Sequence, residues 1–193
     1  MPETLRSLLE EIAACRVCPL PHTPRPVVRA HARARILIAG QAPGRLVHET
    51  GLPWNDPSGD RLRDWMGLDR DAFYDQRNIA VAPMGFCFPG TEKGADLPPR
   101  KECAPLWRAR LLAHLKGVRL TLLVGGYAHK WHLGKRAKAS LTDTVASWRD
   151  YGPDVIPLPH PSWRNTGWLK RNPWFEAELA PALRQRVRAA LAR

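Results

Sequence analysis

The sequence predicts an α/β protein with a parallel sheet that helices cover on both faces. Two observations support this fold class. Four short segments are almost wholly apolar, as is typical of strands buried on both sides, and stretches with helical spacing separate them along the chain. In sheets of this kind the ligand binds beyond the carboxyl ends of the strands, so a site is expected in the loops that follow them.

The bulk composition fits a single domain, residues 1–193, with a core of its own. The chain has 193 residues, of which 44% are hydrophobic, and this content argues against a disordered protein. No apolar run approaches the ~20 residues that cross a bilayer, and acidic residues near the N-terminus argue against a signal peptide. We expect a cytoplasmic monomer with no membrane partner.

Basic residues dominate the charge of the chain. Lys and Arg number 30 against 18 Asp and Glu, and the formal net charge is +12. Such an excess is typical of proteins that bind a polyanion, nucleic acid above all. The alternative is a basic protein from an arginine-rich proteome.

The N-terminal part is expected to hold two helices and a strand. Apolar residues recur at helical spacing in residues 3–14, and a similar pattern follows at 58–67, with Ser58 as the helix cap. Residues 20–34 are rich in proline and basic residues and are expected to be irregular. The apolar run at 35–39 is the first expected strand.

The rest of the chain alternates in the same way. Three more strands are expected from these patterns, at 78–82, 119–124 and 154–158. Three more helices are expected at 101–115, at 174–192 and, as a short helix, from the end of the Gly125-Gly126 pair to Leu133. Residues 85–100 hold several Gly and Pro and are expected to form a loop. Four loops, GQAPG, PMGFC, GGYAH and HPSWRN, begin at strand ends and are expected to meet at one edge of the sheet.

The four cysteines are candidate metal ligands. Cys15 and Cys18 form a C-x-x-C pair, and fifteen residues separate Cys87 from Cys103. Disulfides are disfavoured without a secretion signal, and four thiols with one C-x-x-C pair suggest a metal. Zinc and an iron–sulfur cluster both take four thiolates, but zinc sites more often use two tight pairs, which favours a cluster. Four unrelated buried thiols are the alternative.

These residues together resemble the uracil-DNA glycosylase superfamily. The order of the cysteines is similar to its family-4 branch, which carries a 4Fe–4S cluster, and GQAPG at 40–44 resembles the first motif of that branch. GLPW at 51–54 matches the G-x-P-F motif, whose aromatic residue stacks on the flipped base. HPSWRN at 160–165 resembles the second motif in the H-P-S-x-R-N form of the single-strand-selective branch.

The resemblance covers nearly the whole chain and implies both a fold and an activity. The implied fold is a three-layer α/β/α sandwich around a four-stranded parallel sheet. The implied activity is that of a monofunctional DNA glycosylase, a hydrolase that removes uracil or a related base from damaged DNA in base excision repair. Two alternatives remain: a glycosylase-fold protein that binds lesions without cleavage, and a zinc-bearing interaction domain without a role on DNA.

The resemblance also implies which residues bind the substrate. Glycine and proline in the first motif remove side-chain bulk and fix the backbone, so a nucleotide can approach closely. Trp54 would stack on the extruded base, which is worth ~1–3 kcal/mol, unless it is a core tryptophan. The other expected substrate-binding residues are Gly40, Ala42, Pro43, Gly44, Gly85 and Phe86. Four polar residues are the expected DNA contacts: Ser58, Ser162, Arg164 and Asn165.

The expected catalytic residues are His160, Gln41, Asp56 and His48. His160 would donate a hydrogen bond to the carbonyl oxygen of the departing base. Family-4 proteins carry Glu where this chain has Gln41, which is not a base but can orient a water. Asp56 and His48 are therefore candidates for the water-activating group, and Asp56 is equally suited to cap a helix. Pro83 replaces the Asn that reads the uracil edge in family 4, which leaves the excised base open.

Overall fold

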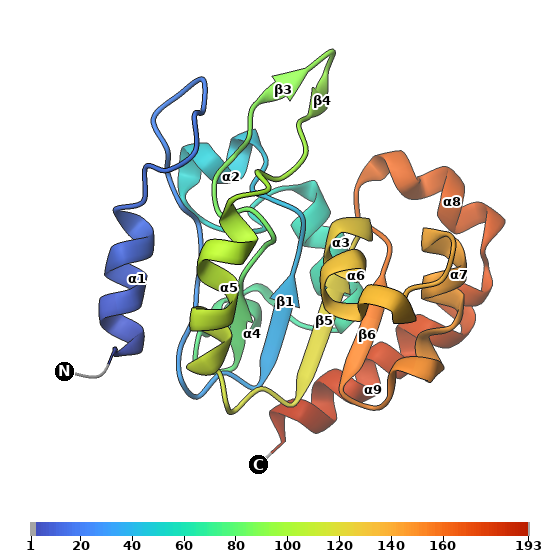
Figure 1. The fold of residues 1–193 in the computed structure, drawn as a ribbon. Coiled ribbons are helices and arrows are strands. Elements are labelled where there is room, and N and C mark those ends of the chain that lie inside the picture. Colours follow the sequence, from blue (N-terminus) through green and yellow to red (C-terminus); the bar gives the residue numbers. More distant parts are fainter. Residues whose placement is uncertain (1–2, 193) are drawn as a thin grey trace.

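A computed structural model describes residues 3–192 and shows a four-stranded parallel sheet between two layers of helices (Figure 1). The strands are β1 (Ile36–Ala39), β2 (Ile79–Val81), β5 (Leu120–Val124) and β6 (Val155–Leu158). They are hydrogen-bonded in the order β2-β1-β5-β6, and every neighbouring pair is parallel. The predicted fold class is confirmed. Across the described residues, no helix combines the length and apolarity needed to span a membrane.

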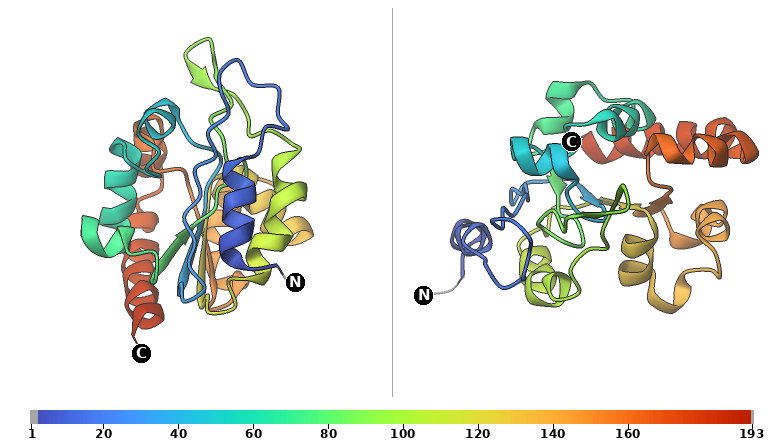
Figure 2. Two further views of the ribbon diagram at one scale, coloured as in Figure 1. Left: turned by 90° about the vertical axis from the view of Figure 1, so that its left-hand side faces the viewer. Right: turned by 90° about the horizontal axis from the view of Figure 1, so that it is seen from above.

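Six helices form the two covering layers, which Figure 2 shows edge-on and from above. One face carries α1 (Leu5–Ala13), α5 (Cys103–Ala113) and α6 (Gly126–Leu133), and the other carries α3 (Pro57–Met66), α4 (Arg70–Tyr74) and α9 (Ala180–Leu191). Successive strand residues point to opposite layers. Ile36 and Ile38 belong to the core with α3 and α9, whereas Leu37 packs in the core with α1 and α5.

Several short elements were not expected from the sequence. These are α2 (Arg45–Thr50), α4, α7 (Leu141–Ala146), α8 (Thr166–Arg171), the single turns η1 (Gly134–Arg136), η2 (Trp148–Tyr151) and η3 (Trp163–Asn165), and the strands β3 (Thr91–Glu92) and β4 (Ala95–Asp96). The segment 85–100 is therefore not a plain loop, because β3 and β4 pair as an antiparallel hairpin within it. Lys93 and Gly94 form its turn with φ of 49° and 75°, the positive values that a type I′ turn requires.

Two predicted helices differ from the structure in informative ways. Helix α3 begins at Pro57, and its N-cap is Asp56 rather than Ser58, since Asp56 Oδ1 accepts the Gly59 N–H at 2.8 Å. The helix expected at 174–192 is divided into a π-helical turn, η4 (Phe175–Leu179), and α9. Pro181, which has no N–H to donate, lies at the start of α9, where the bonding pattern changes.

The buried Arg108 fixes the chain as it leaves β2. Only 1% of this residue is exposed, and its Nη1 donates to the carbonyl oxygens of Ala82 and Pro83 at 2.8 and 3.0 Å. Its Nη2 lies 2.6 Å from Nε2 of His132. Burial, reinforced by the charge of Arg108, lowers the pKa of His132 to about 4, so the neutral imidazole accepts this bond at neutral pH. The segment that follows β2 is thus held by the buried guanidinium of Arg108, which donates hydrogen bonds to its backbone carbonyl oxygens.

Replacing Arg108 with Met should destabilise the fold without adding bulk. Each buried acceptor left without a donor costs ~1–3 kcal/mol, so we expect the free energy of unfolding to fall by about 2–4 kcal/mol. Urea denaturation followed by circular dichroism measures this change. Arg188→Met is the matched control, because it makes the same replacement at an exposed position of another helix, α9. Equal denaturation midpoints for the two variants would contradict the assigned role.

Candidate functional site

A cavity of about 330 Å³ opens at the carboxyl edge of the sheet. Eleven residues singled out from the sequence line it, namely Gly40, Gln41, Ala42, Pro43, Gly44, Trp54, Asp56, Ser58, His160, Ser162 and Arg164. A second cavity of about 270 Å³ shares several of these residues, including Gln41 and His160, and adds Asn165. The structure thus brings residues of the GQAPG, GLPW and HPSWRN motifs together around one space.

Three of the four loops at this edge line the first cavity. The loops after β1 and β6 supply most of the lining, and the loop after β2 contributes Pro83. The loop after β5 stands behind them, since a Cβ on Gly125 would lie 3.9 Å from the Cβ of His160. The expected convergence of loops therefore holds, but the GGYAH loop supports the cavity rather than lining it.

Trp54 lies inside the cavity between Gly40 and His160. A Cβ on Gly40 would be only 3.0 Å from Cζ2 of the indole, which explains the absence of a side chain there. The ring centroids of Trp54 and His160 are 5.7 Å apart, with an angle of 38° between the planes. The indole is half-buried and packs against the edge of the main core, with part of its surface on the cavity.

Helix α3 holds the backbone of Trp54 in an unusual conformation. Its φ is 57°, in the left-handed region that a bulky side chain rarely adopts. The largely buried Arg63 donates from Nη1 to the Trp54 carbonyl oxygen at 3.1 Å. On the other side, a Cβ on Gly59 would lie 1.8 Å from the same oxygen, so only glycine fits. These contacts fix where the indole lies.

His160 is a neutral hydrogen-bond donor held in one tautomer. Burial lowers the pKa of its imidazole, although the charge of Asp56 opposes this shift, so the ring is neutral at neutral pH. Its Nδ1 is placed to accept the backbone N–H of Ser162 at 3.2 Å, which leaves the proton on Nε2. Asn165 donates from Nδ2 to the His160 carbonyl oxygen at 2.7 Å and so steadies the loop.

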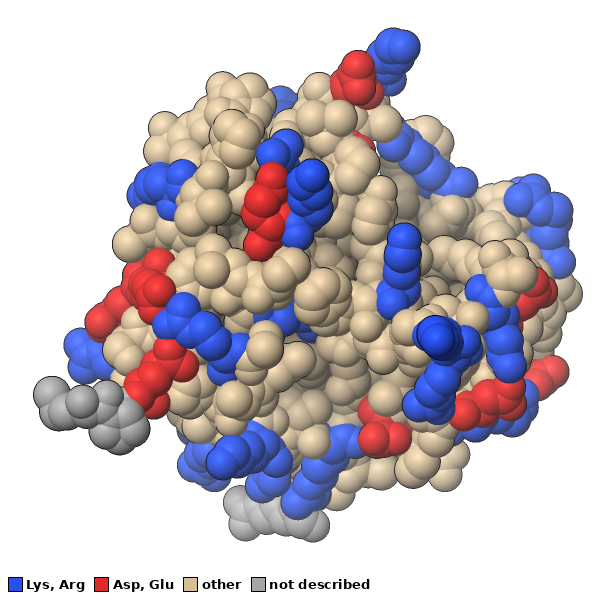
Figure 3. Space-filling model, in the orientation of Figure 1, with Lys and Arg blue, Asp and Glu red and all other residues tan. Residues whose placement is uncertain are grey.

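The rim of the cavity combines basic and aromatic side chains. Arg164 donates from Nη2 to the Gly94 carbonyl oxygen at 2.7 Å and so joins the HPSWRN loop to the hairpin. Trp163 also lines the cavity, and 73% of it is exposed. Away from the rim, Lys and Arg are interspersed with acidic residues over the face that Figure 3 shows, rather than gathered in one patch.

The family model of the Uracil DNA glycosylase superfamily matches residues 28–184. The chain belongs to this superfamily. The predicted resemblance is confirmed at this level, and superfamily membership supports a function of the glycosylase type. Among solved structures, the chain is similar to the solution NMR structure of a candidate uracil DNA glycosylase from Methanosarcina acetivorans. The two chains are 17% identical, the match covers 81% of this chain and 93% of the other, and the TM-score is 0.47.

Three residues expected in the glycosylase pocket lie elsewhere. His48, on α2, packs against His22 and Phe88 with ring centroids 4.5 and 5.8 Å away, and it is not among the residues that line either cavity. Gly85 and Phe86 line the space around the cysteines instead of the pocket floor. The sequence places all three near motif residues in the chain, but α2 and the turn after β2 direct them away.

Among the residues that line the cavity but were not singled out from the sequence are Arg45, Leu46, Asp96 and Trp163. Asp96 belongs to the hairpin, which projects beyond the carboxyl edge of the sheet (Figure 1). The Lys-Gly pair at 93–94 is a two-residue turn signal that could have indicated this hairpin. Trp163 lies within HPSWRN itself, between the polar residues Ser162 and Arg164.

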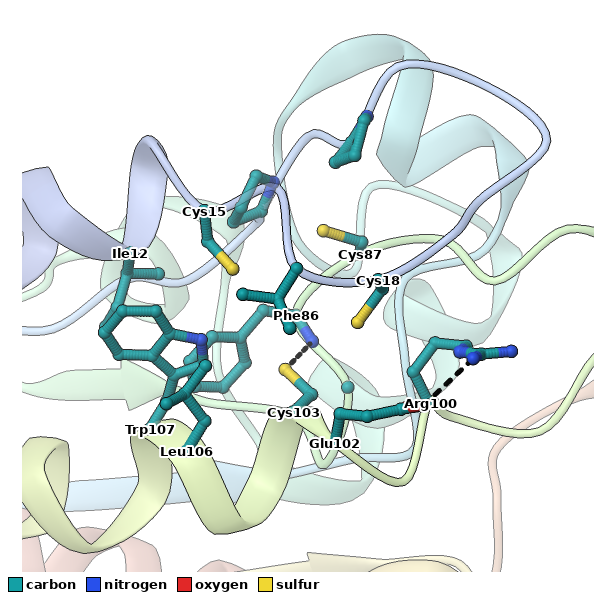
Figure 4. A pocket seen from close by; sticks show the side chains of 14 residues that line it. Ile12, Cys15, Cys18, Phe86, Cys87, Arg100, Glu102, Cys103, Leu106 and Trp107 are labelled. Atoms are coloured by element: carbon teal, nitrogen blue, oxygen red, sulfur yellow. Dashed lines mark hydrogen bonds and ion pairs between the residues drawn. The ribbon is translucent and has the colours of Figure 1, made fainter.

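The four cysteines of this superfamily member line a separate, largely apolar cavity (Figure 4). All four are free thiols that come from the segment after α1, the loop after β2 and the start of α5. Burial raises the pKa of Cys87 to about 11 and that of Cys103 to about 12. The Phe86 N–H donates to Sγ of Cys103 at 3.2 Å. Within residues 3–192, no three Cys, His, Asp or Glu side chains are close enough together to hold a single metal ion.

One short segment separates the two sites. The N–H groups of Met84 and Gly85 donate to the carbonyl oxygens of Gly40 and Gln41 at 2.8 and 2.9 Å. Pro83 faces the first cavity, whereas Gly85 faces the cysteines. The first motif and the cysteine loop therefore share backbone hydrogen bonds.

A methyl group at Gly59 should disturb the position of Trp54. Gly→Ala inside a helix normally raises stability by up to ~1 kcal/mol, but here we expect a loss of about 1–3 kcal/mol from overpacking against the Trp54 carbonyl oxygen. Thermal unfolding measures the change. Gly126→Ala in α6 is the matched control, because a Cβ there meets nothing within 4 Å and should leave the protein at least as stable. A stabilised Gly59→Ala variant would show that α3 does not constrain Trp54.

Proposed function

We propose that the protein is a monofunctional DNA glycosylase that hydrolyses the N-glycosidic bond of uracil, or of a related base, in damaged DNA. The observation that carries this proposal is the pairing of Trp54 with a neutral His160 inside one cavity. An enzyme that cleaves this bond needs a flat surface for the extruded base and a donor for its developing negative charge. Superfamily membership supports the same reaction class.

The two rings have distinct tasks in this proposal. The Trp54 indole stacks on the flipped base, and such contacts are worth ~1–3 kcal/mol per base. The Nε2–H of His160 donates to the carbonyl oxygen on which negative charge develops as the base departs. A single donor of this kind typically contributes ~3–4 kcal/mol to transition-state stabilisation. Because the ring is neutral and its tautomer fixed, this donor is available at neutral pH.

The identity of the base depends on groups other than Pro83. This residue lines the cavity but offers neither an N–H nor a polar side chain to the base. Gln41 lines the same cavity, and its amide carries both a donor and an acceptor. It is therefore suited to read the edge of uracil, of a modified uracil or of another deaminated base.

The absence of an amine in the cavities favours hydrolysis alone. Among the described residues, no lysine lines either cavity. A lyase step needs an amine that forms a Schiff base with the sugar. Arg45 and Arg164 at the rim are suited to contact phosphates, and the exposed Trp163 to stack on a neighbouring base.

A panel of oligonucleotides tests the activity. Single- and double-stranded DNA containing uracil, hydroxymethyluracil, hypoxanthine or xanthine is incubated with the protein and then treated with alkali. We expect strand breaks at one of these bases, reduced about 10²–10³-fold in rate by His160→Ala. His31→Ala, outside the cavities, serves as the control and should retain the wild-type rate. Tight lesion binding without cleavage of any nucleobase would favour the alternative. That alternative is a lesion-binding protein, in which Gln41 stands where family 4 has a glutamate.

We also propose that Cys15, Cys18, Cys87 and Cys103 hold a 4Fe–4S cluster. The residues fit such a group, because four free thiols surround one apolar space and a backbone N–H already faces one sulfur. The alternative, zinc, needs four ligands around a single ion, with sulfurs ~2.3 Å from it. Four thiolates satisfy either group, and the single C-x-x-C pair favours the cluster. The cluster would join the N-terminal segment to the start of α5.

Metal analysis of the purified protein tests the cluster. We expect iron and sulfide at about four atoms each per chain and a brown colour. Cys103→Ser should lose most of the iron and unfold at a lower temperature. Ser162→Ala, outside the cysteine cavity, should keep both. A colourless protein with one zinc ion per chain would instead support the zinc alternative.

A further inference from the structure

Asp96 presents an unpartnered carboxylate to both cavities. It lies at the end of β4, opposite Thr91, and lines the two spaces that meet at Gln41 and His160. Its Oδ2 lies against the first motif, since a Cβ on Gly44 would be 3.4 Å from it. Among the described residues, no hydrogen bond engages this carboxylate, and only the charges of Arg164 and Asp56 act on it.

The hairpin that carries Asp96 is anchored at both ends. The Leu97 N–H donates to the Gly90 carbonyl oxygen at 2.9 Å and closes its base. At the tip, Arg164 binds the Gly94 carbonyl oxygen at 2.7 Å. The carboxylate is therefore held between the first motif and the HPSWRN loop rather than carried on a free loop.

The other candidates for the water-activating group are already engaged or lie elsewhere. Gln41 has no ionisable group. Oδ1 of Asp56 caps α3 at 2.8 Å from the Gly59 nitrogen. His48 packs against two other rings outside the cavities. Nδ1 of His160 accepts a backbone N–H, so the ring has no free acceptor nitrogen for a water proton.

We propose that Asp96 faces the sugar of the bound nucleotide, where it stabilises the positive charge that develops at C1′ and takes the proton of the attacking water. The proposal rests on the glycosylase function proposed above. As the C1′–N bond breaks, its electron pair leaves with the base, which His160 holds. The water oxygen then bonds to C1′ and passes one proton to Asp96, which releases it to solvent. The departing base takes up a proton from solvent, and the products are an abasic site and the free base.

The surroundings of Asp96 suit a base that works near neutral pH. Although Asp96 is an exposed residue, the partial desolvation of its carboxyl raises the pKa; Arg164 opposes this shift, and the charge of Asp56 adds to it. A carboxylate whose pKa lies closer to the operating pH is a better general base. His160, which also lines both cavities, is neutral and adds no charge. Activity should therefore fall as the pH drops through the raised pKa of Asp96.

Two uncleavable DNA ligands test the position of the charge. One carries a neutral tetrahydrofuran abasic site and the other a pyrrolidine ring, which is cationic like the sugar in the transition state. At fixed salt, we expect the wild-type protein to prefer the cationic ligand at least about tenfold, since an opposite charge within a few ångströms acts strongly in such a site. Asp96→Asn should lose this preference.

Glu92→Gln provides the matched control for long-range charge. Glu92 lies on β3 of the same hairpin, and its substitution removes one negative charge, as Asp96→Asn does. It is not among the residues that line either cavity. This variant should keep the preference for the cationic ligand. No preference in the wild-type protein, or an equal loss in both variants, would overturn the proposal.

Kinetics separates this proposal from the proposed function. On the base that the wild-type protein cleaves best, Asp96→Asn should lower kcat about 10²–10⁴-fold and remove the acidic limb of the pH profile, with KM little changed. An unchanged kcat would overturn the role of Asp96 and leave the glycosylase function standing. If the wild-type protein cleaves none of the bases, the proposed function fails, and the affinity ratio still decides whether Asp96 lies at the charged sugar.

Discussion

The left-handed backbone of Trp54 is the constraint on which the geometry of the site depends. This conformation is held by α3, which packs closely against the Trp54 carbonyl oxygen. Gly59 leaves room for that oxygen, and Arg63 donates a hydrogen bond to it. The same indole then favours glycine at position 40, where a Cβ would lie 3.0 Å from the ring. Backbone strain of this kind costs of order 1–3 kcal/mol and persists only where the surroundings over-determine it. Gly40 in the first motif and Gly59 in α3, which look independent in the sequence, are thus both constrained by Trp54.

Part of the basic character of the chain serves the architecture rather than a partner. Arg63 and Arg108 are both buried, and both donate to backbone carbonyl oxygens at the carboxyl edge of the sheet. A guanidinium can satisfy several acceptors at once, which suits loops whose carbonyls have no partner strand. The net charge of +12 therefore overstates the charge available for a polyanion. The groups at the mouth of the cavity, Arg45 and Arg164, are the relevant ones.

The sequence predicted the sheet, its main helices and the meeting of the motif loops, because buried parallel strands and amphipathic helices leave strong periodic patterns. It did not predict features set by contacts between distant segments. His48, for example, packs in a ring cluster with His22 and Phe88, which lie far from it in the chain, and not in the cavity. The hairpin at 91–96 has only two residues in each strand, which is too short for any periodic pattern to indicate Asp96.

The segment from Pro83 to Phe86 has one side on each cavity, and its peptide groups are bonded to the first motif. A change in the backbone on the side of the cysteine cavity is therefore transmitted to the first cavity. Oxidation of the cysteine thiols would displace the segment from Pro83 to Phe86. Because Met84 and Gly85 are hydrogen-bonded to Gly40 and Gln41, the first motif would move with it. Loss of the proposed activity after exposure to air would then reflect a displaced backbone in the first cavity, with its side chains chemically intact.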